Sequence, residues 1–551
     1  MFWIDALLRC YLKQPRKLSR KSAIFVGSAW GLSIGVLAVL VRTFEAAAFF
    51  RFWAALDELR WVLAGSIALI LVTASVFRSR HLSPIQKHRF AIGLCLTLLC
   101  LVFTFRLEGF SGRMFPNLVW RWSPSPGERF ARFHRAQSEL RTLGESVMEP
   151  VDLTKTSDTD YPGFLGAHRH GVSGPVNIER NWSENPPRNL WSHPVGLGWS
   201  SFSVVSEFAI TQEQRDNLEC VVCYELKTGR ERWVHSDEAR FDNPGAHGAG
   251  PRSTPTVHAG MVFTMGATGV LNCLAGGTGK VRWQHELFES PGTQNLTWGM
   301  SGSPLIVDST VVVATGAGFG RSVVAFDIET GEERWAEGDA PTAYASLQLA
   351  ILNGVRQILW FNGLGLCGLI PENGRVMWNF PWKTQGDQMV NVAQPLVLAD
   401  FGYRPSDPLV LISSGYDQGC ALLRVSCMND VWLPQCVWQN KLLKSKFSNM
   451  LVEDGFVYGM DNGIMVCMDL SDGRQCWKRG RYGHGQLLML GHLILVQAES
   501  GEIILIDPNP NELRELSRLP GLGEKTWNHL AVAGRILLSR NDRTAICFEL
   551  K

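Results

Sequence analysis

The sequence is short of three features that mark common classes of binding protein and enzyme. Its 53 Lys and Arg residues are balanced by 51 Asp and Glu, and the net charge of +2 comes with no basic stripe among the later aromatics. This argues against nucleic-acid binding. Cys220-Val221-Val222-Cys223 is a lone CxxC without suitably spaced histidines, so no metal site is predicted. Strong helix formers become scarce after about residue 150, where Gly, Val, Ser and Thr are plentiful, as an all-β domain requires.

One eleven-residue phrase recurs along the second part of the chain. In Ala325–Trp335 it reads as a strand, a tight turn and a returning strand, with Gly331 supplying the positive φ of the turn. The tryptophan lies four residues after the glycine. The same register is found in Cys223–Trp233, Cys273–Trp283, Gly368–Trp378 and Cys467–Trp477. Five copies in one register indicate a repeat protein.

Further copies are incomplete in a way that predicts a closed ring. Met428-Asn429-Asp430 leads to Trp438 without the turn glycine, and Leu505-Ile506-Asp507 leads to about Glu515 without a tryptophan. The chain ends in a first strand, Cys547–Lys551, while Asn189–Ser192 is a second strand with no hairpin before it. If these two segments share one sheet, the chain forms eight four-stranded units in a ring. The tryptophans predicted to dock neighbouring sheets are Trp191, Trp233, Trp283, Trp335, Trp378, Trp438 and Trp477.

The repeated phrase resembles the tryptophan-docking repeat of quinoprotein-type (PQQ-like) eight-bladed β-propellers. That family includes quinoprotein alcohol dehydrogenases and BamB, the lipoprotein of the outer-membrane β-barrel assembly machinery. Tyr161–Gly171 also looks like the short opening motif of bacterial PQQ-like repeat proteins. The resemblance implies an all-β, eight-bladed propeller over residues 161–551. It is specific for the fold and weak for function, because one propeller scaffold hosts many activities.

The first 106 residues are interpreted as a membrane anchor. Apolar runs at about 23–41, 61–77 and 90–106 are each near the length of a membrane-spanning helix. A buried core helix is the competing interpretation, but three runs in a row with basic flanks favour membrane spans. Lys and Arg are concentrated before the first run and between the second and third. The positive-inside rule therefore places the N-terminus in the cytoplasm and the propeller on the periplasmic side of a bacterial inner membrane.

Residues 107–160 are predicted to connect the anchor to the propeller. Trp120 and Trp122 are candidate interfacial anchors, and Gly127–Val147 has the apolar spacing of an amphipathic helix. We expect this helix to be a spacer lying on the propeller or the membrane surface, in preference to a partner-binding helix. Residues 149–160 are polar and are interpreted as a linker.

The cysteines allow two disulfides. Cys427 and Cys436 flank one hairpin, Cys467 and Cys476 flank another with the same spacing, and either pair can be a disulfide in an oxidising periplasm. Other cysteines of the repeat occupy the position that Ala325 fills in a sister copy. We interpret these as small buried hydrophobic residues.

A PQQ-dependent membrane-bound dehydrogenase of sugars or alcohols is the alternative function. The resemblance implies that such an enzyme holds PQQ with a Ca²⁺ cage of Glu, Asn and Asp, and that the alcohol dehydrogenases add a disulfide between adjacent cysteines. This sequence has no Cys-Cys pair, and no position can be assigned to the calcium ligands. Membrane-bound sugar dehydrogenases of the family lack that disulfide and combine N-terminal spans with a propeller, which keeps this alternative open. No catalytic residue or metal ligand is predicted, and no cofactor is expected unless the alternative holds.

The preferred hypothesis is a non-catalytic binding or scaffolding propeller that meets a protein partner or a small ligand at one end of its central channel. Polar and aromatic groups of the loops leading into the innermost strands converge there. Ordinary polar packing around a water-filled channel is the competing interpretation. A BamB-like role is the specific form of the hypothesis, although that family is usually anchored by a lipid on cysteine. The candidate binding residues are His247, Arg252, Ser253, Trp298, Tyr344, Gln348, Asn391, Gln394, Asn449, His484, Trp527, Asn528 and His529.

Overall fold

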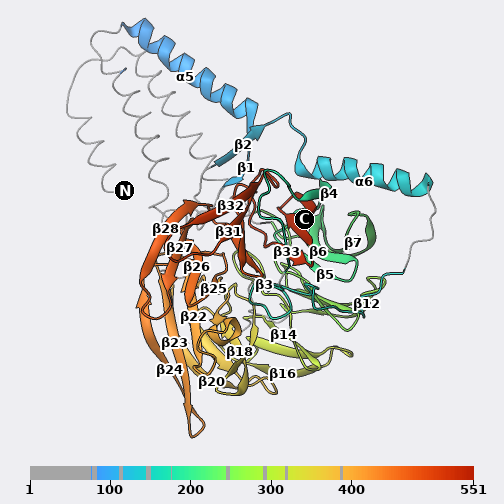
Figure 1. The fold of residues 1–551 in the computed structure, drawn as a ribbon. Coiled ribbons are helices and arrows are strands. Elements are labelled where there is room, and N and C mark those ends of the chain that lie inside the picture. The colour runs from blue at the N-terminus through green and yellow to red at the C-terminus, as the bar shows by residue number, and fades with distance from the viewer. Residues whose placement is uncertain are drawn as a thin grey trace, which may run out of the picture. The chain divides into compact units, whose positions relative to one another are not determined.

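The computed structural model describes residues 76, 83–110, 116–143, 150–174, 176–242, 248–288, 295–316, 320–384 and 389–551 (Figure 1). The chain divides into two compact units, Met1–Phe103 and Thr104–Lys551. Apart from position 76, the predicted spans 23–41 and 61–77 lie outside the described residues. Helix α5 (Pro84–Thr104) covers most of the third predicted span. Across the described ranges, no helix combines the length and the apolar content expected of a membrane span.

Two elements precede the propeller in the second unit. A hairpin joins β1 (Phe105–Phe110) to β2 (Pro116–Trp120), and helix α6 (Pro126–Leu143) follows. Ser125 and Glu128 form a reciprocal capping box that fixes the start of α6, since each side chain accepts a hydrogen bond from the main-chain N–H of the other. Phe133 stacks on His193 of β4 with ring centroids 4.8 Å apart. These contacts place α6 on the propeller, as expected of a spacer.

Eight antiparallel sheets, here called blades 1 to 8, follow one another along residues 203–551, and each runs from an inner to an outer strand (Figure 1). Blade 1 contains β5 (Ser203–Val205), β6 (Phe208–Arg215), β7 (Leu218–Glu225) and β8 (Glu231–Asp237). Blade 2 contains β9 (Thr256–His258), β10 (Met261–Met265), β11 (Val270–Ala275) and β12 (Val281–Glu286). Blade 3 contains β13 (Leu305–Val307), β14 (Thr310–Ala314), β15 (Val323–Asp327) and β16 (Glu333–Glu337). Blade 4 contains β17 (Gln348–Leu352), β18 (Val355–Phe361), β19 (Gly365–Leu369) and β20 (Val376–Pro381).

The second half of the ring repeats this pattern with two additions. Blade 5 contains β21 (Leu396–Val397), the 3₁₀-helix η1 (Leu398–Phe401), β22 (Leu409–Ser414), β23 (Gly419–Met428) and β24 (Val431–Asn440). Blade 6 contains β25 (Leu451–Glu453), β26 (Phe456–Asp461), β27 (Ile464–Asp469) and β28 (Gln475–Arg481). Blade 7 contains β29 (Gln486–Leu490), β30 (Leu493–Gln497), β31 (Ile503–Asp507), β32 (Arg514–Leu519) and, on its inner edge, β3 (Val172–Ser173). The hairpin of β23 and β24 extends beyond the neighbouring strands at the bottom of Figure 1.

The last blade closes the ring with strands from both ends of the propeller sequence. Blade 8 consists of β33 (Ala531–Ala533), β34 (Ile536–Arg540), β35 (Thr544–Glu549) and the N-terminal strand β4 (Arg188–Pro194). In its register, Cys547 lies opposite Trp191. The predicted closure and the predicted count of eight sheets are both confirmed.

Apolar side chains form wedges between neighbouring blades. One cluster joins Phe263 of blade 2 to Val311 of blade 3, and another joins Leu359 of blade 4 to Leu423 of blade 5. Since both faces of a blade are buried against its neighbours, a single blade would leave much apolar surface in water, and stability depends on the stack.

Every blade has a β-bulge at the same place in its outer strand. The pairing between third and fourth strands slips by one residue immediately before the docking position. In blade 3, Trp335 pairs with Ala325 and Glu333 with Phe326, so Arg334 is the extra residue. A bulge increases local twist and re-aims the next side chain. This turns the docking side chain toward the following blade.

The docking tryptophans hold neighbouring blades together through a repeated hydrogen bond. Trp283 Nε1 donates to the carbonyl oxygen of Ile328 in the turn of blade 3 at 3.0 Å. A Cβ placed on Gly331 in that turn would lie 2.7 Å from the Trp283 ring, so glycine is required for packing as well as for its φ of 75°. Equivalent bonds run from Trp191 to Leu226, Trp233 to Gly276, Trp335 to Pro371, Trp438 to Leu470 and Trp477 to Asn509.

Two joints of the ring depart from this pattern. Trp378 packs with Leu423 of blade 5, whose copy of the phrase lacks the turn glycine, and it donates to Gln357 Oε1 within its own blade at 2.7 Å. In blade 7 the docking register falls on Ser517, two residues after the predicted position at about Glu515, because the proline-containing turn is longer. Trp182 is 3% exposed and belongs to the apolar cluster that contains Leu505 and Leu519 of blade 7. Its main-chain N–H donates to Ser517 Oγ at 2.9 Å. It fills the place of the missing tryptophan.

Neither predicted disulfide is present, and the two cysteine pairs differ in their strand register. Cys427 lies opposite Trp432 and Cys436 opposite Leu423, so these two thiols do not face each other. Cys467 lies opposite Trp477, and Cys476 is the bulge residue beside it. All four are free thiols. Cys220 and Cys223 belong to different apolar clusters, because residues three apart on a strand point to opposite faces.

Candidate binding site on the propeller axis and loop face

The ring has two ends, which we call the loop face and the turn face. The loop face carries the loops that lead from the outer strand of one blade to the inner strand of the next. The turn face carries the turns of the repeated phrase. All the sequence-predicted binding residues that the structure describes come from the loop face, while His247 lies outside the described residues.

The axis is filled by one segment, Tyr161–Ser173, which we call the axial segment. Tyr161 pairs with Val204 of blade 1, and the main-chain N–H of Val257 in blade 2 donates to the Pro162 oxygen at 2.8 Å. At the other end, β3 runs parallel to β29 of blade 7, and Ser173 Oγ donates to Val532 of blade 8 at 3.3 Å. The predicted opening motif therefore binds the inner strands of blades 1, 2, 7 and 8.

Arg169 anchors the axial segment at the loop face. Its Nη1 donates to the carbonyl oxygens of Ser303 at 3.1 Å and Leu347 at 2.9 Å, and its Nη2 donates to Pro304 and to Thr256 Oγ1. The residue is 6% exposed, and burial lowers its pKa to about 9 because the charged form loses its hydration. The guanidinium thus ties blades 2, 3 and 4 to the axis through neutral oxygens.

An inner ring of polar side chains surrounds the axis, two residues before each inner strand. Three of its four hydroxyl members link consecutive blades by accepting a main-chain N–H from the blade before. The fourth, Ser201, donates through Oγ to the His529 oxygen of blade 8 at 2.7 Å. Ser201 donates to Thr254 Oγ1 at 3.2 Å, Thr254 to Ser303 Oγ at 2.9 Å, and Ser303 to Ser346 Oγ at 3.0 Å. The full ring is Ser201, Thr254, Ser303, Ser346, Gln394, Asn449, His484 and His529. Sequence reasoning missed the hydroxyl half, although aligning the copies on their inner strands would have shown it.

The predicted amide residues also form links between blades. Gln394 Nε2 donates to Ser346 O at 3.1 Å and to Gln348 Oε1 at 3.2 Å. Asn449 Oδ1 accepts the main-chain N–H of Leu487 at 3.1 Å. Each of these three side chains is at most 2% exposed, so they are structural in this arrangement.

Asn391 and Asn528 behave in the same way. Asn391 Nδ2 donates to Asn362 O at 2.7 Å, and Asn528 Nδ2 donates to Ser200 O at 2.8 Å. Predicted Ser253 is fully buried, and its oxygens accept from Gln212. The interpretation of these residues as ordinary polar packing fits the geometry, with the difference that they surround a segment of protein.

The two described histidines of the inner ring are buried. His529 lies edge-on to Phe164 of the axial segment at 5.0 Å, and desolvation lowers its pKa to about 3. His484 is 2% exposed, and its main-chain N–H donates to Glu499 Oε2 at 3.1 Å. Neither imidazole is presented to solvent at a face where it could act as a proton carrier.

An outer ring of larger side chains lies four residues before the inner strands. Five of the eight positions are aromatic, and the ring consists of Trp199, Arg252, Ser301, Tyr344, Val392, Phe447, Tyr482 and Trp527. Trp199 and Phe447 are half-buried, while Trp527 is 9% exposed. Trp298 adds to this ring, because its indole lies 5.2 Å from the Tyr344 ring. Only part of this ring was predicted, and the spacing to the inner strand is the signal that identifies the remainder.

Cations lie over the aromatic groups of the loop face. Lys525 Nζ is 4.4 Å from the centroid of Trp527 and 5.0 Å from that of Trp199, and burial lowers its pKa. Lys446 Nζ lies 5.0 Å from the Tyr416 ring. Such cation–π contacts hold flat aromatic surfaces at the edge of the protein in fixed orientations.

Arg252 and Glu219 lie near this ring, close enough for the charge of each to influence the other. The Arg252 guanidinium lies 4.6 Å over Phe241 and donates to Gly248 O at 2.8 Å, and burial lowers its pKa to about 10. Burial raises the pKa of Glu219 to about 7, although a hydrogen bond from Ala267 N–H at 3.0 Å and the charge of Arg252 both act to lower it. Glu219 was not predicted, since an acidic residue at the start of a strand carries no distinguishing pattern.

Calcium-bound PQQ does not fit the side chains at this end of the axis. Ca²⁺ takes about six to eight oxygen ligands in which carboxylates are prominent, whereas the inner ring offers hydroxyls, amides and imidazoles. Glu499 already accepts hydrogen bonds from Trp527 Nε1 and His484 N–H. Within the described ranges, no cluster of three or more His, Cys, Asp or Glu side chains is placed to hold a metal ion. We therefore derive no reaction through PQQ.

Sequence and structure comparisons agree with this architecture. The family profile described as outer membrane protein assembly factor BamB matches residues 218–479. Comparison with curated protein sequences returned no match. Quinohemoprotein alcohol dehydrogenase from Comamonas testosteroni is 11% identical, with 71% of this chain and 80% of that chain covered at a TM-score of 0.50. BamB from Moraxella catarrhalis is 17% identical, with 66% and 98% covered at a TM-score of 0.47.

The eight blades form a closed ring, in which docking tryptophans join neighbouring blades and the axial segment binds the inner strands. This architecture is an eight-bladed β-propeller. The phrase that supplies the docking residues lies largely inside the matched profile. Over residues 218–479 the chain is similar to the BamB profile, and its fold is that of the solved eight-bladed propellers.

Proposed function

We propose that the chain is a non-catalytic binding or scaffolding module whose loop face takes up a protein partner. The outer aromatic ring of that face is the observation that carries the proposal. Aromatic and Arg side chains are enriched in protein interfaces, because rigid flat groups bury much area at a small entropic cost. The matched profile bears the name of an assembly factor, which supports a role in protein–protein contact.

The closed axis supports binding at the face over chemistry inside the channel. Arg169 and the inner ring occupy the loop-face end of the axis with hydrogen bonds between blades. A partner would therefore meet the half-buried Trp199, Trp298 and Phe447 around that closed centre. A dehydrogenase is the alternative, and it would require a different arrangement of the axial segment.

We further propose that the module is anchored in a bacterial inner membrane with its propeller in the periplasm. The three apolar runs and the distribution of Lys and Arg support this location. Protease treatment of intact spheroplasts tests it. We expect the propeller to be cleaved from outside while the N-terminal residues stay membrane-bound, and protection of the propeller would overturn the topology.

Photo-crosslinking from the two faces of the full chain tests the binding proposal. A benzoylphenylalanine at Trp298 or Tyr416 samples the loop face, and one at Ile351 or Met428, which are 62% and 68% exposed, samples the turn face as a matched control. We expect one defined protein adduct from the loop-face positions, lost in a Phe447→Ala and Trp199→Ala double variant that keeps its thermal unfolding midpoint.

Two results would overturn this proposal. Equal adducts from both faces would mean that the aromatic ring has no special role. Stoichiometric uptake of PQQ with Ca²⁺ by the purified full chain, followed by reduction of a dye in the presence of a sugar or alcohol, would establish the dehydrogenase instead.

A further inference from the structure

Blade 6 carries two thiols at its docking bulge. Cys467 on β27 lies opposite Trp477 on β28, and the register slips so that Cys476 is the extra residue before the tryptophan. Because two residues of a bulge oppose one residue of the partner strand, Cys476 and Trp477 both lie against Cys467. Cys476 packs on the apolar cluster that contains Cys467, and it lies close enough to raise the pKa of the Cys467 thiol.

The chain supplies a matched pair that lacks this geometry. Cys427 and Cys436 are also nine residues apart around a hairpin, in blade 5. There the hairpin is longer, so Cys427 lies opposite Trp432 and Cys436 opposite Leu423. Sequence spacing is identical in the two pairs, and only the strand register distinguishes them.

We propose that Cys467 and Cys476 are a reversible dithiol–disulfide site, whereas Cys427 and Cys436 remain thiols. A disulfide needs Cα atoms about 4.4–6.8 Å apart with Cβ atoms facing each other, which neighbouring residues across a strand pair supply. The proposal concerns the folded chain in a thiol–disulfide buffer, so it does not rest on the proposed location or partner.

The exposures of the two thiols set the order of the exchange. Cys476 is half-buried and Cys467 is fully buried. The Cys476 thiolate attacks an external disulfide RSSR, forming a mixed disulfide and releasing RS⁻. The Cys467 thiolate then attacks the Cys476 sulfur, the Cys467–Cys476 bond forms, and the second RS⁻ leaves. The dithiol loses two protons and two electrons, and RSSR gains them to become two RSH.

The second step should be the slow one. Burial raises the pKa of the Cys467 thiol to about 12, with a smaller contribution from the adjacent Cys476, so little thiolate is present at neutral pH. Since the thiolate is the nucleophile, we expect the mixed disulfide at Cys476 to be detectable before the internal bond closes.

The site lies next to the joint between blades 6 and 7. Trp477 follows Cys476 directly, and its Nε1 donates to Asn509 O of blade 7 at 2.8 Å. A bond from the bulge to β27 would fix the outer strand that carries this tryptophan. Oxidation should therefore stabilise the joint between blades 6 and 7 against local unfolding, and reduction should destabilise it, without a change elsewhere in the ring.

Peptide mapping of the full chain tests the proposal. The protein is equilibrated with reduced and oxidised glutathione at a series of ratios, quenched with acid, alkylated in denaturant and cleaved with trypsin. Cleavage after Arg474 separates Cys467 from Cys476, so their disulfide appears as a link between peptides 447–474 and 475–478. Cys427 and Cys436 share peptide 425–441, where a disulfide would appear as a loss of two hydrogens.

We expect the 447–474 to 475–478 link to rise with the oxidised glutathione fraction, while peptide 425–441 stays fully alkylated. Cys476→Ser should abolish the link, and Cys436→Ser should leave it unchanged. The proposal is wrong if both blade 6 thiols remain alkylated at every ratio in folded wild-type protein, or if the two pairs oxidise equally. Because the wild-type map is decisive by itself, a variant that fails to fold does not block the test.

Discussion

The rim and the axis of this propeller are held together in different ways. At the rim, the docking tryptophan of one blade donates to a carbonyl in the next, and the joint recurs from Trp191 to Trp477 with small changes. At the axis, one segment, Tyr161–Ser173, makes a different contact with each group of blades. A rim joint connects two neighbours, whereas the axial segment connects strands from across the ring.

This difference divides the stability of the ring between local and shared contacts. In stacked repeats, the loss of one interface is felt mainly by the two repeats that share it. A change in the axial segment acts on several interfaces at once, because Arg169 binds blades 2, 3 and 4 through one side chain. We therefore expect the largest effects at the axis, smaller ones at the rim, and a gradient within the rim that follows burial.

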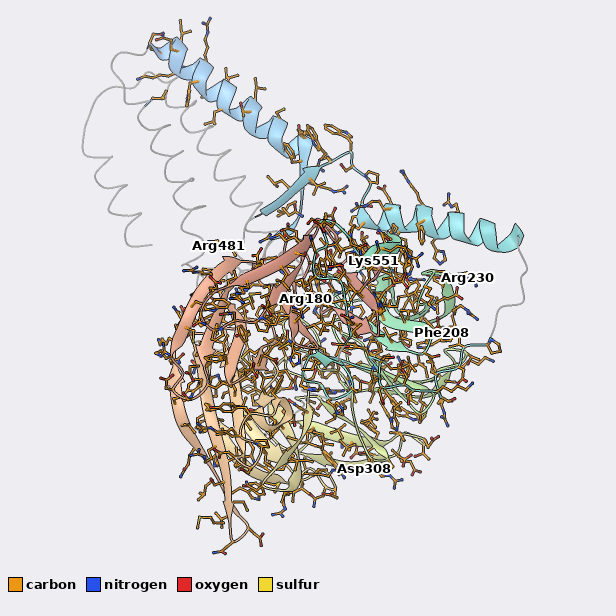
Figure 2. The ribbon with its side chains drawn as sticks, viewed as in Figure 1. Arg180, Phe208, Arg230, Asp308, Arg481 and Lys551 are labelled. Atoms are coloured by element: carbon orange, nitrogen blue, oxygen red, sulfur yellow. The ribbon has the colours of Figure 1, made fainter. Side chains whose placement is uncertain are left out.

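The first prediction concerns the axial anchor. Arg169→Ala leaves the carbonyl oxygens of Ser303, Pro304 and Leu347 without this donor. At about 1–3 kcal/mol for each oxygen, the free energy of unfolding should fall by about 3–9 kcal/mol. Urea denaturation of the full chain measures it. The control is Arg356→Ala, which removes an exposed ion pair with Asp308 (labelled in Figure 2) and should cost about 1 kcal/mol or less. Equal effects in the two variants would mean that the rim alone holds the ring.

The second prediction tests the gradient within the rim. Trp283 is 8% exposed, and Trp283→Ala should lower the free energy of unfolding by about 3–5 kcal/mol. Trp335 makes the same kind of hydrogen bond but is only half-buried, so Trp335→Ala should cost about 2–3 kcal/mol. Thermal unfolding of the two variants in parallel gives the comparison. An unchanged melting temperature for Trp283→Ala would contradict its docking role.

The third prediction separates packing from backbone strain at the rim. Gly331 and Gly354 have nearly the same φ, 75° and 76°, but a Cβ on Gly331 would lie 2.7 Å from Trp283, whereas nothing lies within 4 Å of one on Gly354. Gly354→Ala should cost about 1–2 kcal/mol from the left-handed backbone alone. Gly331→Ala should cost about 1–3 kcal/mol more, because it also overpacks the joint. Denaturation midpoints that move equally would show that the glycine serves only the turn.

The same division explains what the sequence could reveal. Trp335 and Gly331 recur at fixed spacing in sister copies, so the rim joints, the blade count and the closure by Trp191 could all be predicted from periodicity. Trp182 could not, because it replaces the missing tryptophan of blade 7 from a segment outside the repeat. Arg169 was passed over for the same reason, since it lies in a segment that occurs once. For the candidate site, the spacing of the amides and aromatics located the loop face, but register and burial were needed to separate structural residues such as Asn449 from half-buried ones such as Trp298.

The final prediction concerns the pH dependence of the axis. His529 is buried against Phe164, and desolvation lowers its pKa to about 3 from the unfolded value of 6.5. Below pH 6.5 the unfolded chain binds a proton at this histidine and the folded chain does not, so the free energy of unfolding falls as pH falls toward 3. One such proton is equivalent to about 1.4 kcal/mol per pH unit, or about 2 kcal/mol between pH 6.5 and 5.

His529→Gln should flatten this acid slope by about one proton, which urea denaturation at a series of pH values measures directly. The control is His492→Gln, an exposed residue in the turn between β29 and β30, where Glu453 raises the histidine pKa. A raised pKa stabilises the folded state at low pH and loses this effect as pH rises, so the control should leave the acid slope the same or slightly steeper. If both variants flatten the slope equally, the acid sensitivity of the ring does not originate at its axis.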